Sequence, residues 1–411
     1  MTVAPQGARA APKRSWAFAA LLASIAMLGP FAVDMYLPAF GAIEAEFGVA
    51  PLAMQQTLSA YLIAFAFMML WHGALADSLG RRPVVLGGLA VFALGTLGCA
   101  IAGNIESLWL FRVLQGLSAG SGVVVGRAII RDRYHGAEAQ RMMSHVTLVF
   151  GIGPALAPVL GGVFLNFFGW RWIFWFMLAY TLTLLLVCLR YLPETLPRAQ
   201  RHPLHPTALW ANYRVVLTRP AFLLLALVTS LSFCGWFLYI VSAPYFLSGL
   251  LGVSTWGFGW LFVPMIAGIM IGAFFSGRIA GRMPPHRTIG TGFALMGVAA
   301  SLNLIVSHAL PPWVVWNIAP LFLCTLGWAL AMPSITLTLL DLFPAMRGMT
   351  ASLQGFAQFA LGAVVAGSIS PLLSHSLPGL AWGMAAFVAA SAVPWFLYRR
   401  HLASARKEIA S

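Results

Sequence analysis

Residues 73–83 read Gly-Ala-Leu-Ala-Asp-Ser-Leu-Gly-Arg-Arg-Pro, a short polar turn between apolar runs at 52–73 and 83–103. Each run has about the 20 residues that a helix needs to cross the hydrocarbon core of a bilayer. A degenerate copy of the turn, Gly-Arg-Ile-Ala-Gly-Arg-Met-Pro-Pro-His-Arg, lies 204 residues later at 277–287. The repeat predicts two similar halves, each made of several membrane-spanning helices.

The composition excludes a soluble globular protein. Of 411 residues, 60% are apolar and only 8% are charged, whereas soluble domains carry about 25% charged residues. We expect an all-α integral membrane protein with twelve transmembrane helices in two pseudo-symmetric six-helix bundles. The predicted spans are 16–40, 52–73, 83–103, 107–130, 141–164, 172–192, 220–247, 254–277, 288–307, 313–337, 349–374 and 380–398.

The basic residues predict the orientation. With the N-terminus inside, 22 of the 24 Lys and Arg residues fall on the cytoplasmic side, and only Arg171 lies in an outer loop and Arg112 within a span. Basic residues are retained on the cytoplasmic side of short loops, so both termini are expected to be cytoplasmic. The net charge of +14 is scattered between apolar runs, which argues against a nucleic-acid partner.

The spans and their connections divide the chain into five segments. The longest connection, near the middle of the chain, is rich in Pro, Arg and His and is predicted to link the halves. The predicted segments are a cytoplasmic N-terminus at 1–15, an N-terminal bundle at 16–192, a cytoplasmic linker at 193–219, a C-terminal bundle at 220–398 and a cytoplasmic tail at 399–411.

Charges within the spans are the strongest functional signal, because a charged side chain at the bilayer centre is unfavourable by at least about 2.5 kcal/mol. Asp34 is the single acidic residue expected inside a span, and Arg112 lies at a similar depth in the fourth span. We expect Asp34 to carry a proton, with its protonation set by burial and by Arg112 close by. The alternatives are a purely structural ion pair and an Asp34 side chain that extends outward to the membrane surface.

The turn at 73–83 also has a mechanical interpretation. Gly80 permits a sharp turn, and Asp77 can face the positive N-terminal end of the helix predicted to begin near Met349. We expect Arg81 and Arg82 to meet acidic residues at the same face, such as Asp132 and Glu138.

Three stretches carry a family resemblance. The turn at 73–83 resembles the loop motif GxLaDrxGrRp of the major facilitator superfamily. The segment 110–116, which contains Arg112, resembles a fourth-span motif of proton-driven facilitators. The segment 151–162 resembles the antiporter motif GxxxGPxxGG, with a spacing that differs by about one residue. With 31–38 and 127–134, the chain is similar to the bicyclomycin/chloramphenicol resistance (Bcr/CflA) branch of drug:proton antiporters.

The resemblance implies a multidrug efflux transporter of a bacterial inner membrane that exchanges an amphenicol- or bicyclomycin-type drug for protons. It implies no cofactor, no metal and no enzymatic activity, and we expect a monomer. A proton-coupled symporter or exporter of a small metabolite is the alternative. The implied latch residues are Gly73, Asp77, Gly80, Arg81 and Arg82, and the implied antiporter residues are Gly153, Pro154, Pro158, Gly161 and Gly162.

A drug site should be an apolar and aromatic cavity with few polar anchors. Candidate ligands of the drug are Asp34, Tyr36, Tyr61, Phe65, Phe233, Trp236, Tyr239, Gln354 and Gln358. The four cysteines lie in separate apolar runs and are interpreted as packing residues. Four histidines near span ends are expected to be solvated at the membrane interface, namely His72, His145, His308 and His375.

Overall fold

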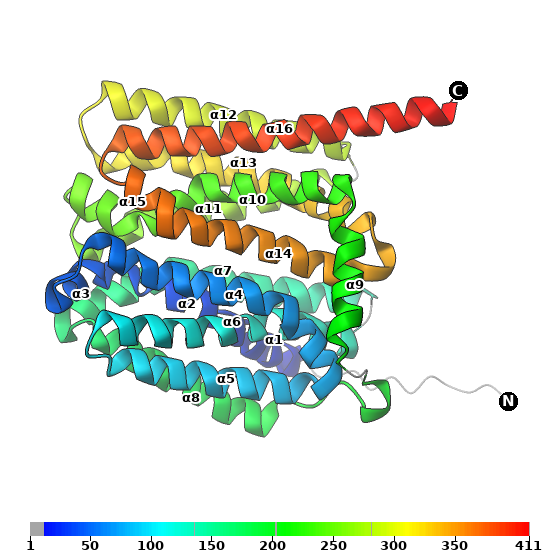
Figure 1. Ribbon diagram of the computed structural model, residues 1–411, viewed down its shortest axis with the longest axis horizontal. Helices are drawn as coiled ribbons and strands as arrows, with labels where there is room; N and C mark the ends of the chain where they lie inside the picture. The colour runs from blue at the N-terminus through cyan, green and yellow to red at the C-terminus, as the bar shows by residue number, and fades with distance from the viewer. Residues whose placement is uncertain (1–11, 135, 202–203, 281, 411) are drawn as a thin grey trace.

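The computed structural model describes residues 12–134, 136–201, 204–280 and 282–410. The long helices lie roughly parallel in one bundle (Figure 1). Within the described residues, 11 helices are long and apolar enough to cross a membrane, and a bent pair supplies a twelfth span. The prediction of an all-helical protein with twelve spans is confirmed.

The first six spans comprise eight helices and a short turn. They are α1 (Pro12–Ala26), α2 (Leu28–Asp34), the 3₁₀ turn η1 (Leu37–Ala39), α3 (Phe40–Phe47), α4 (Pro51–Leu79), α5 (Arg81–Ala100), α6 (Ile105–Arg133), α7 (Gly136–Phe168) and α8 (Arg171–Tyr191).

The remaining spans follow a short helix, α9 (Pro206–Leu217). They are α10 (Pro220–Val241), α11 (Gly259–Ile279), α12 (Pro285–Ala309), α13 (Val314–Asp341), α14 (Arg347–Val364) with the π-helical segment η6 (Val365–Ile369) and α15 (Ser370–Leu373), and α16 (Leu377–Ala410). Two further short elements, the π-helical η3 (Pro244–Leu250) and the 3₁₀ helix η4 (Thr255–Phe258), join α10 to α11.

The first span is broken, whereas the sequence predicted one continuous helix over 16–40. It bends by 41° between Ala26 and Leu28, and α2 ends at Asp34. Each break lies four residues before a proline, Pro30 or Pro38. A proline has no N–H for the carbonyl four residues earlier, and its ring clashes with that carbonyl. The prolines therefore place Asp34 at the end of a short helix.

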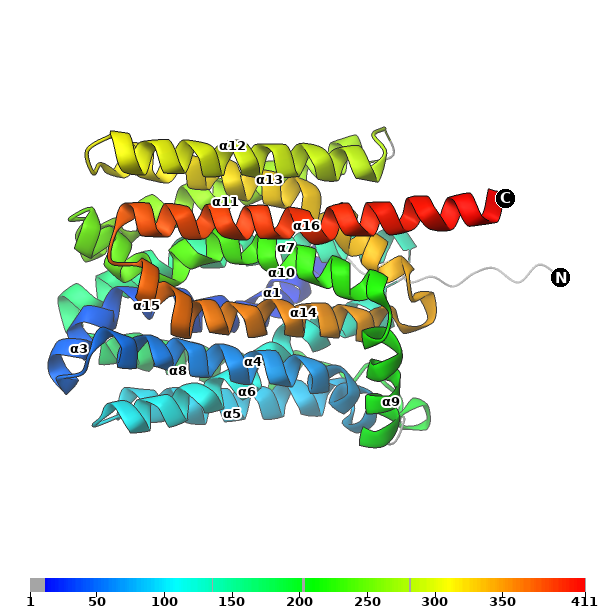
Figure 2. The ribbon, with the colours of Figure 1, turned by 45° about the horizontal axis from the view of Figure 1, so that its top comes forward.

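The segment predicted as a linker contains a helix. Helix α9 runs across the ends of the spanning helices (Figure 2). The Tyr213 hydroxyl of α9 donates a 2.6 Å hydrogen bond to the Leu70 carbonyl of α4. The linker helix therefore contacts α4, and it also packs against α10 and α14.

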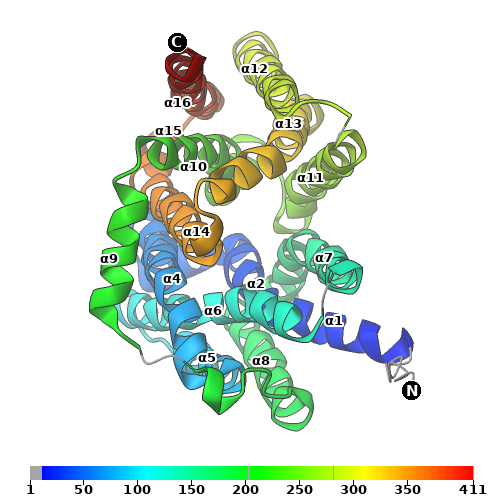
Figure 3. The same cartoon turned by 90° about the vertical axis from the view of Figure 1, so that its right-hand side faces the viewer.

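The spanning helices form two groups, α1–α8 and α10–α16, which Figure 3 shows from the end where α16 finishes. We call this the terminal end, and the other the opposite end. Helices α4 and α14 lie side by side across the boundary between the groups (Figure 2). We propose that these two groups are the two halves predicted from the repeat.

Candidate functional site

The turn between α4 and α5 is set by Gly80, which has a φ of 104°. A Cβ at this position would collide with the side chains of Glu194 and Arg201, which form an ion pair with each other. Glu194 also accepts a hydrogen bond of 3.0 Å from the Arg81 backbone N–H. Only glycine fits this turn, because both its backbone conformation and its surroundings exclude a side chain.

Arg81 links three elements at the terminal end. Its guanidinium forms ion pairs with Asp77 of α4 at 2.5 Å and with Asp132 of α6 at 3.0 Å. The Thr195 hydroxyl donates a further 2.9 Å hydrogen bond to Asp132. The sequence predicted an acidic partner for Arg81 at Asp132, and this contact is present.

Arg82 is bound differently from Arg81. Its guanidinium donates a 2.6 Å hydrogen bond to the backbone carbonyl of Leu189 on α8, where the sequence suggested an acidic partner. The other suggested partner, Glu138, is exposed, and none of the ion pairs among the described residues includes it. Gly73, the first latch residue, packs loosely, since a Cβ there would make only an ordinary 3.9 Å contact with Val124.

The position of Asp77 follows from the pairing of α4 with α14. Ser59 donates to the Ala363 carbonyl at 2.9 Å, and Gln56 donates to the Gly367 carbonyl at 2.8 Å. In these two pairs the residue number falls on one helix as it rises on the other, so the helices are antiparallel. The same register places Asp77 level with the first turn of α14, the positive end of that helix dipole.

Arg112 is fully buried on α6. One terminal nitrogen donates 2.8 Å hydrogen bonds to the Ala32 carbonyl of α2 and to Gln115. The guanidinium also lies 4.6 Å from the ring centre of Tyr36 and 4.4 Å from that of Tyr61. Its Nε and other terminal nitrogen have no hydrogen-bond partner among the described residues. The cation is held by rings and neutral acceptors.

Asp34 is buried at the end of α2. No ion pair within 4 Å joins it to any basic side chain in the described part of the chain. The close contact that we expected between Asp34 and Arg112 is therefore absent, because Arg112 is turned to the Ala32 carbonyl of the same short helix. Asp34 and Arg112 still belong to one region, since Asp34 is the last residue of α2 and Arg112 donates to a carbonyl of the same helix.

Three of the aromatic drug ligands predicted from the sequence have partners within their own half. Tyr36 shares a 2.8 Å hydrogen bond with Thr57, and Tyr61 donates to the Gly29 carbonyl at 3.3 Å. The hydroxyl of Tyr239 accepts a 2.6 Å hydrogen bond from Asn303. Tyr36 and Tyr239 are fully buried, and these contacts are those of packing residues.

The other aromatic candidates belong to a continuous series of rings that crosses between the halves. From Tyr61 of α4, ring centres follow at 6.1 Å to Phe65, 4.8 Å to Phe359 of α14, and 5.9 Å to Phe233 of α10. The series continues at 4.9 Å to Trp236 and at 5.2 Å to Trp328 of α13. We call these six residues the aromatic series.

Sequence reasoning missed Phe359 and Trp328. Each is one of many apolar residues in its span, and the sequence of the span does not mark the face on which the ring lies. The one available signal concerns Phe359, which directly follows the predicted ligand Gln358 in the sequence. Of the two predicted glutamines, Gln354 is buried and donates to Thr336 at 3.3 Å, and Gln358 is half-buried.

The antiporter-like stretch of α7 packs on its neighbours through small residues. A Cβ on Gly161 would collide with the Met35 carbonyl, and one on Gly162 would lie 2.6 Å from the Thr255 carbonyl of the other half. A Cβ on Gly153 would meet Met27 at 3.0 Å. Pro154 and Pro158 lie inside the same helix. The stretch therefore permits close approach to the broken first span.

The prediction for His72 was wrong. It is buried on α4, and its Nδ1 has no hydrogen-bond partner in the described structure. Its ring packs against Gly120 of α6, where an added Cβ would lie 3.2 Å from Nδ1. The error arises because α4 continues to Leu79, beyond the predicted span end at residue 73. His308 and His375 are exposed, and His145 stacks on Trp16. All four cysteines are buried and free, as expected.

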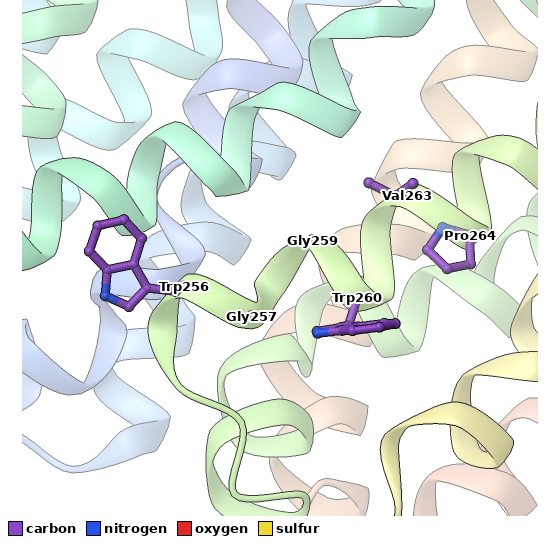
Figure 4. A pocket seen from close by; sticks show the side chains of 6 residues that line it. All are labelled: Trp256, Gly257, Gly259, Trp260, Val263 and Pro264. Atoms are coloured by element: carbon purple, nitrogen blue, oxygen red, sulfur yellow. The ribbon is translucent and has the colours of Figure 1, made fainter.

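A crevice of about 300 Å³ lies at the opposite end, lined by Trp256, Gly257, Gly259, Trp260, Val263 and Pro264 (Figure 4). Trp260 and Val263 are more than half exposed, at 59% and 51%. Exposed apolar side chains on a spanning helix are typical of a lipid-facing surface, and tryptophan is enriched at membrane interfaces. We interpret this crevice as lipid-facing and separate from the aromatic series.

Comparison with known proteins adds independent information. The family model described as Major Facilitator Superfamily matches residues 22–367. The chain is 28% identical to the bicyclomycin resistance protein homolog of Haemophilus influenzae, over 95% of this chain and 98% of that protein. It is 29% identical to the chloramphenicol resistance protein of Pseudomonas aeruginosa, over 90% and 87% of the two chains.

Solved structures share the fold. The human organic anion transporter MFSD10 superposes with a TM-score of 0.69 at 19% identity, over 95% of this chain and all of that chain. A D-xylose-proton symporter superposes with a TM-score of 0.71 at 16% identity, over 92% and 97% of the two chains. At these identities the likeness concerns the fold alone.

Proposed function

The chain belongs to the Major Facilitator Superfamily, and we propose on this basis that it exports lipophilic drugs in exchange for protons. It is a multi-pass membrane transporter and not an enzyme, and it requires no cofactor. Two relatives that align along nearly their whole length are named for resistance to bicyclomycin and to chloramphenicol. Drugs of these types are therefore our proposed substrates, with a metabolite symporter as the alternative.

The observation that carries this proposal is the buried carboxyl group of Asp34. It lies at a break in the first span and forms no ion pair within the described residues. Since no ion pair among the described residues fixes its charge, its protonation can follow its access to water. A carboxyl group that gains a proton on one side of the membrane and loses it on the other couples proton flow to conformational change.

The contacts between the halves support alternating access. Hydrogen bonds from Gln55 to Ser370 at 2.8 Å and from Tyr245 to Glu44 at 2.5 Å join the halves near the opposite end. At the terminal end, the network of Arg81 lies within the first half and the linker. We propose that this conformation is closed at the opposite end and that both termini are cytoplasmic, in a bacterial inner membrane.

The test compares the intact protein with Asp34→Asn in everted membrane vesicles and in a drug-susceptibility panel. We expect chloramphenicol uptake into everted vesicles to require an inside-acid gradient, and Asp34→Asn to abolish it. The matched control is Asp341→Asn, which removes an exposed carboxylate paired with Arg347 and should leave transport unchanged. Uptake driven by the reverse gradient would favour the symporter, and full activity of Asp34→Asn would refute the proton carrier.

A further inference from the structure

Two tryptophans of the second half have unused hydrogen-bond donors. The indole N–H groups of Trp236 and Trp328 are buried and have no partner among the described residues. By contrast, the indole of Trp316, also on α13, donates a 2.9 Å hydrogen bond to the Pro311 carbonyl. A buried donor without an acceptor is unfavourable by about 1–3 kcal/mol. Such a pair of donors therefore requires an explanation.

The location of the two indoles links them to transport. They end the aromatic series, which begins at Tyr61 beside Arg112 and passes from α4 to α14. Both indole side chains are only partly buried, although their nitrogen atoms are enclosed. The two unused donors therefore lie in the second half, at the end of a series of rings that reaches the first half.

Acidic and basic side chains are scarce on the helices of the second half that carry these rings. Helix α10 has no Asp, Glu, His, Lys or Arg, and of these residue types α13 and α14 carry only the terminal Asp341 and Arg347. A molecule resting against these helices therefore meets aromatic faces, the hydroxyl and amide groups of the spans, and the two indole N–H groups. An anion or a cation would find no counter-charge there, and burying an unpaired ion is strongly unfavourable.

We propose that Trp236 and Trp328 form a subsite for an uncharged aromatic group that carries hydrogen-bond acceptors, such as a nitro or amide group. Each indole donates one hydrogen bond to the ligand, while Phe233 and Phe359 pack against the aromatic ring of the ligand. The proposal rests on the proposed drug export and adds the chemical class that this half of the transporter selects.

The test measures equilibrium binding of two radiolabelled probes to the purified full-length protein. Chloramphenicol is uncharged and carries nitro and amide oxygens, whereas tetraphenylphosphonium is an aromatic cation without acceptors. The variants Trp236→Phe and Trp328→Phe keep an aromatic ring but remove the N–H group. A neutral hydrogen bond contributes about 0.5–1.5 kcal/mol, so each variant should weaken chloramphenicol binding by about two- to twelvefold. Tetraphenylphosphonium has no acceptor for the indole N–H groups, so its binding should change by less than about twofold.

Trp316→Phe is the matched control, because it removes an indole N–H that already has a backbone acceptor. It should leave the binding of both probes unchanged. Equal weakening of both probes by the Trp236 and Trp328 variants would show that the rings serve only as apolar surface, and no weakening of either would show that the N–H groups are unused. Both results overturn the subsite while leaving drug export intact. Failure of the intact protein to bind chloramphenicol would overturn the proposed substrate as well.

Discussion

The hydrogen bonds between α4 and the span made of α14, η6 and α15 should control how often the opposite end opens. Gln55, Gln56 and Ser59 donate to Ser370, the Gly367 carbonyl and the Ala363 carbonyl at 2.8, 2.8 and 2.9 Å. We predict that the triple variant Gln55→Ala, Gln56→Ala, Ser59→Ala shifts the protein toward a conformation open at this end. The reason is that these bonds join the halves only while that end is closed.

The size of the shift follows from the number of bonds removed. A buried neutral hydrogen bond contributes about 0.5–1.5 kcal/mol net, so three contribute about 3 kcal/mol. At about 1.4 kcal/mol per factor of ten, the equilibrium constant for opening should rise roughly 140-fold. If about 1 molecule in 100 is open in the intact protein, more than half would be open in the variant.

Spin labels on the two halves can measure this population. Ile101 and Leu310 are exposed, at 63% and 43%, and follow α5 and α12 at the opposite end. Cysteines at these positions, in a chain without its own four, allow a distance measurement by double electron–electron resonance. We expect a longer distance to become dominant in the triple variant. Ser391→Ala, which removes a buried hydrogen bond to Val388 within α16, should leave the distances unchanged. An identical distribution in the triple variant would refute the reasoning.

Three further predictions concern single residues. Gly161→Ala should lower transport and reduce the free energy of unfolding by about 1–3 kcal/mol through overpacking. Gly151→Ala, where nothing lies within 4 Å of the added Cβ, should change neither quantity; transport and thermal-unfolding assays measure both. Arg81→Ala should slow turnover but change stability by only about 1 kcal/mol, because one of its two acidic partners is 53% exposed; a large loss of melting temperature would contradict this. Arg112→Lys should lower drug transport at least tenfold despite the retained charge, because lysine lacks the planar group that lies against two tyrosine rings; wild-type rates would argue against it.

The sequence predicted the spans well because their signal is local. Twenty apolar residues in a row are sufficient to indicate a spanning helix, and Gly80 with two arginines indicates a turn between two of them. The break before Asp34 was also encoded, since Pro30 and Pro38 each disrupt the helix four residues earlier. We missed it because a hydropathy window registers length and not backbone hydrogen bonds.

The site was less predictable, because its features depend on contacts between distant segments. Nothing near Trp328 in the chain distinguishes it from other tryptophans, and its neighbours Phe233 and Trp236 come from another helix. Asp34 and Arg112 were identified as lone charges within spans, but sequence could not indicate that Arg112 points to a backbone carbonyl. A charged residue in an apolar run can be recognised in the sequence, whereas the group that it contacts in the folded protein cannot.

The separation of charge between the halves bears on the direction of coupling. Asp34 lies in the first half, while the proposed subsite of Trp236 and Trp328 in the second half offers no charge. A ligand that merely excluded water from Asp34 would favour the protonated carboxyl, so proton and drug would bind together, as in a symporter. Exchange requires the opposite linkage, in which binding of the drug favours release of the proton. The ligand must stabilise the ionised carboxylate, and therefore needs a hydrogen-bond donor facing Asp34 as well as acceptors facing the indoles.

Chloramphenicol has hydroxyl donors and nitro and amide acceptors, so it meets both requirements. We therefore predict that its binding to the purified protein in weakly buffered solution releases protons, detected with a pH-indicator dye, and that Asp34→Asn abolishes the release while Asp341→Asn preserves it. By reciprocity, acidifying the solution should weaken chloramphenicol binding to the intact protein by the same linkage. Proton uptake on chloramphenicol binding would mean that drug and proton bind together. It would exclude exchange through Asp34, even if the drug is transported.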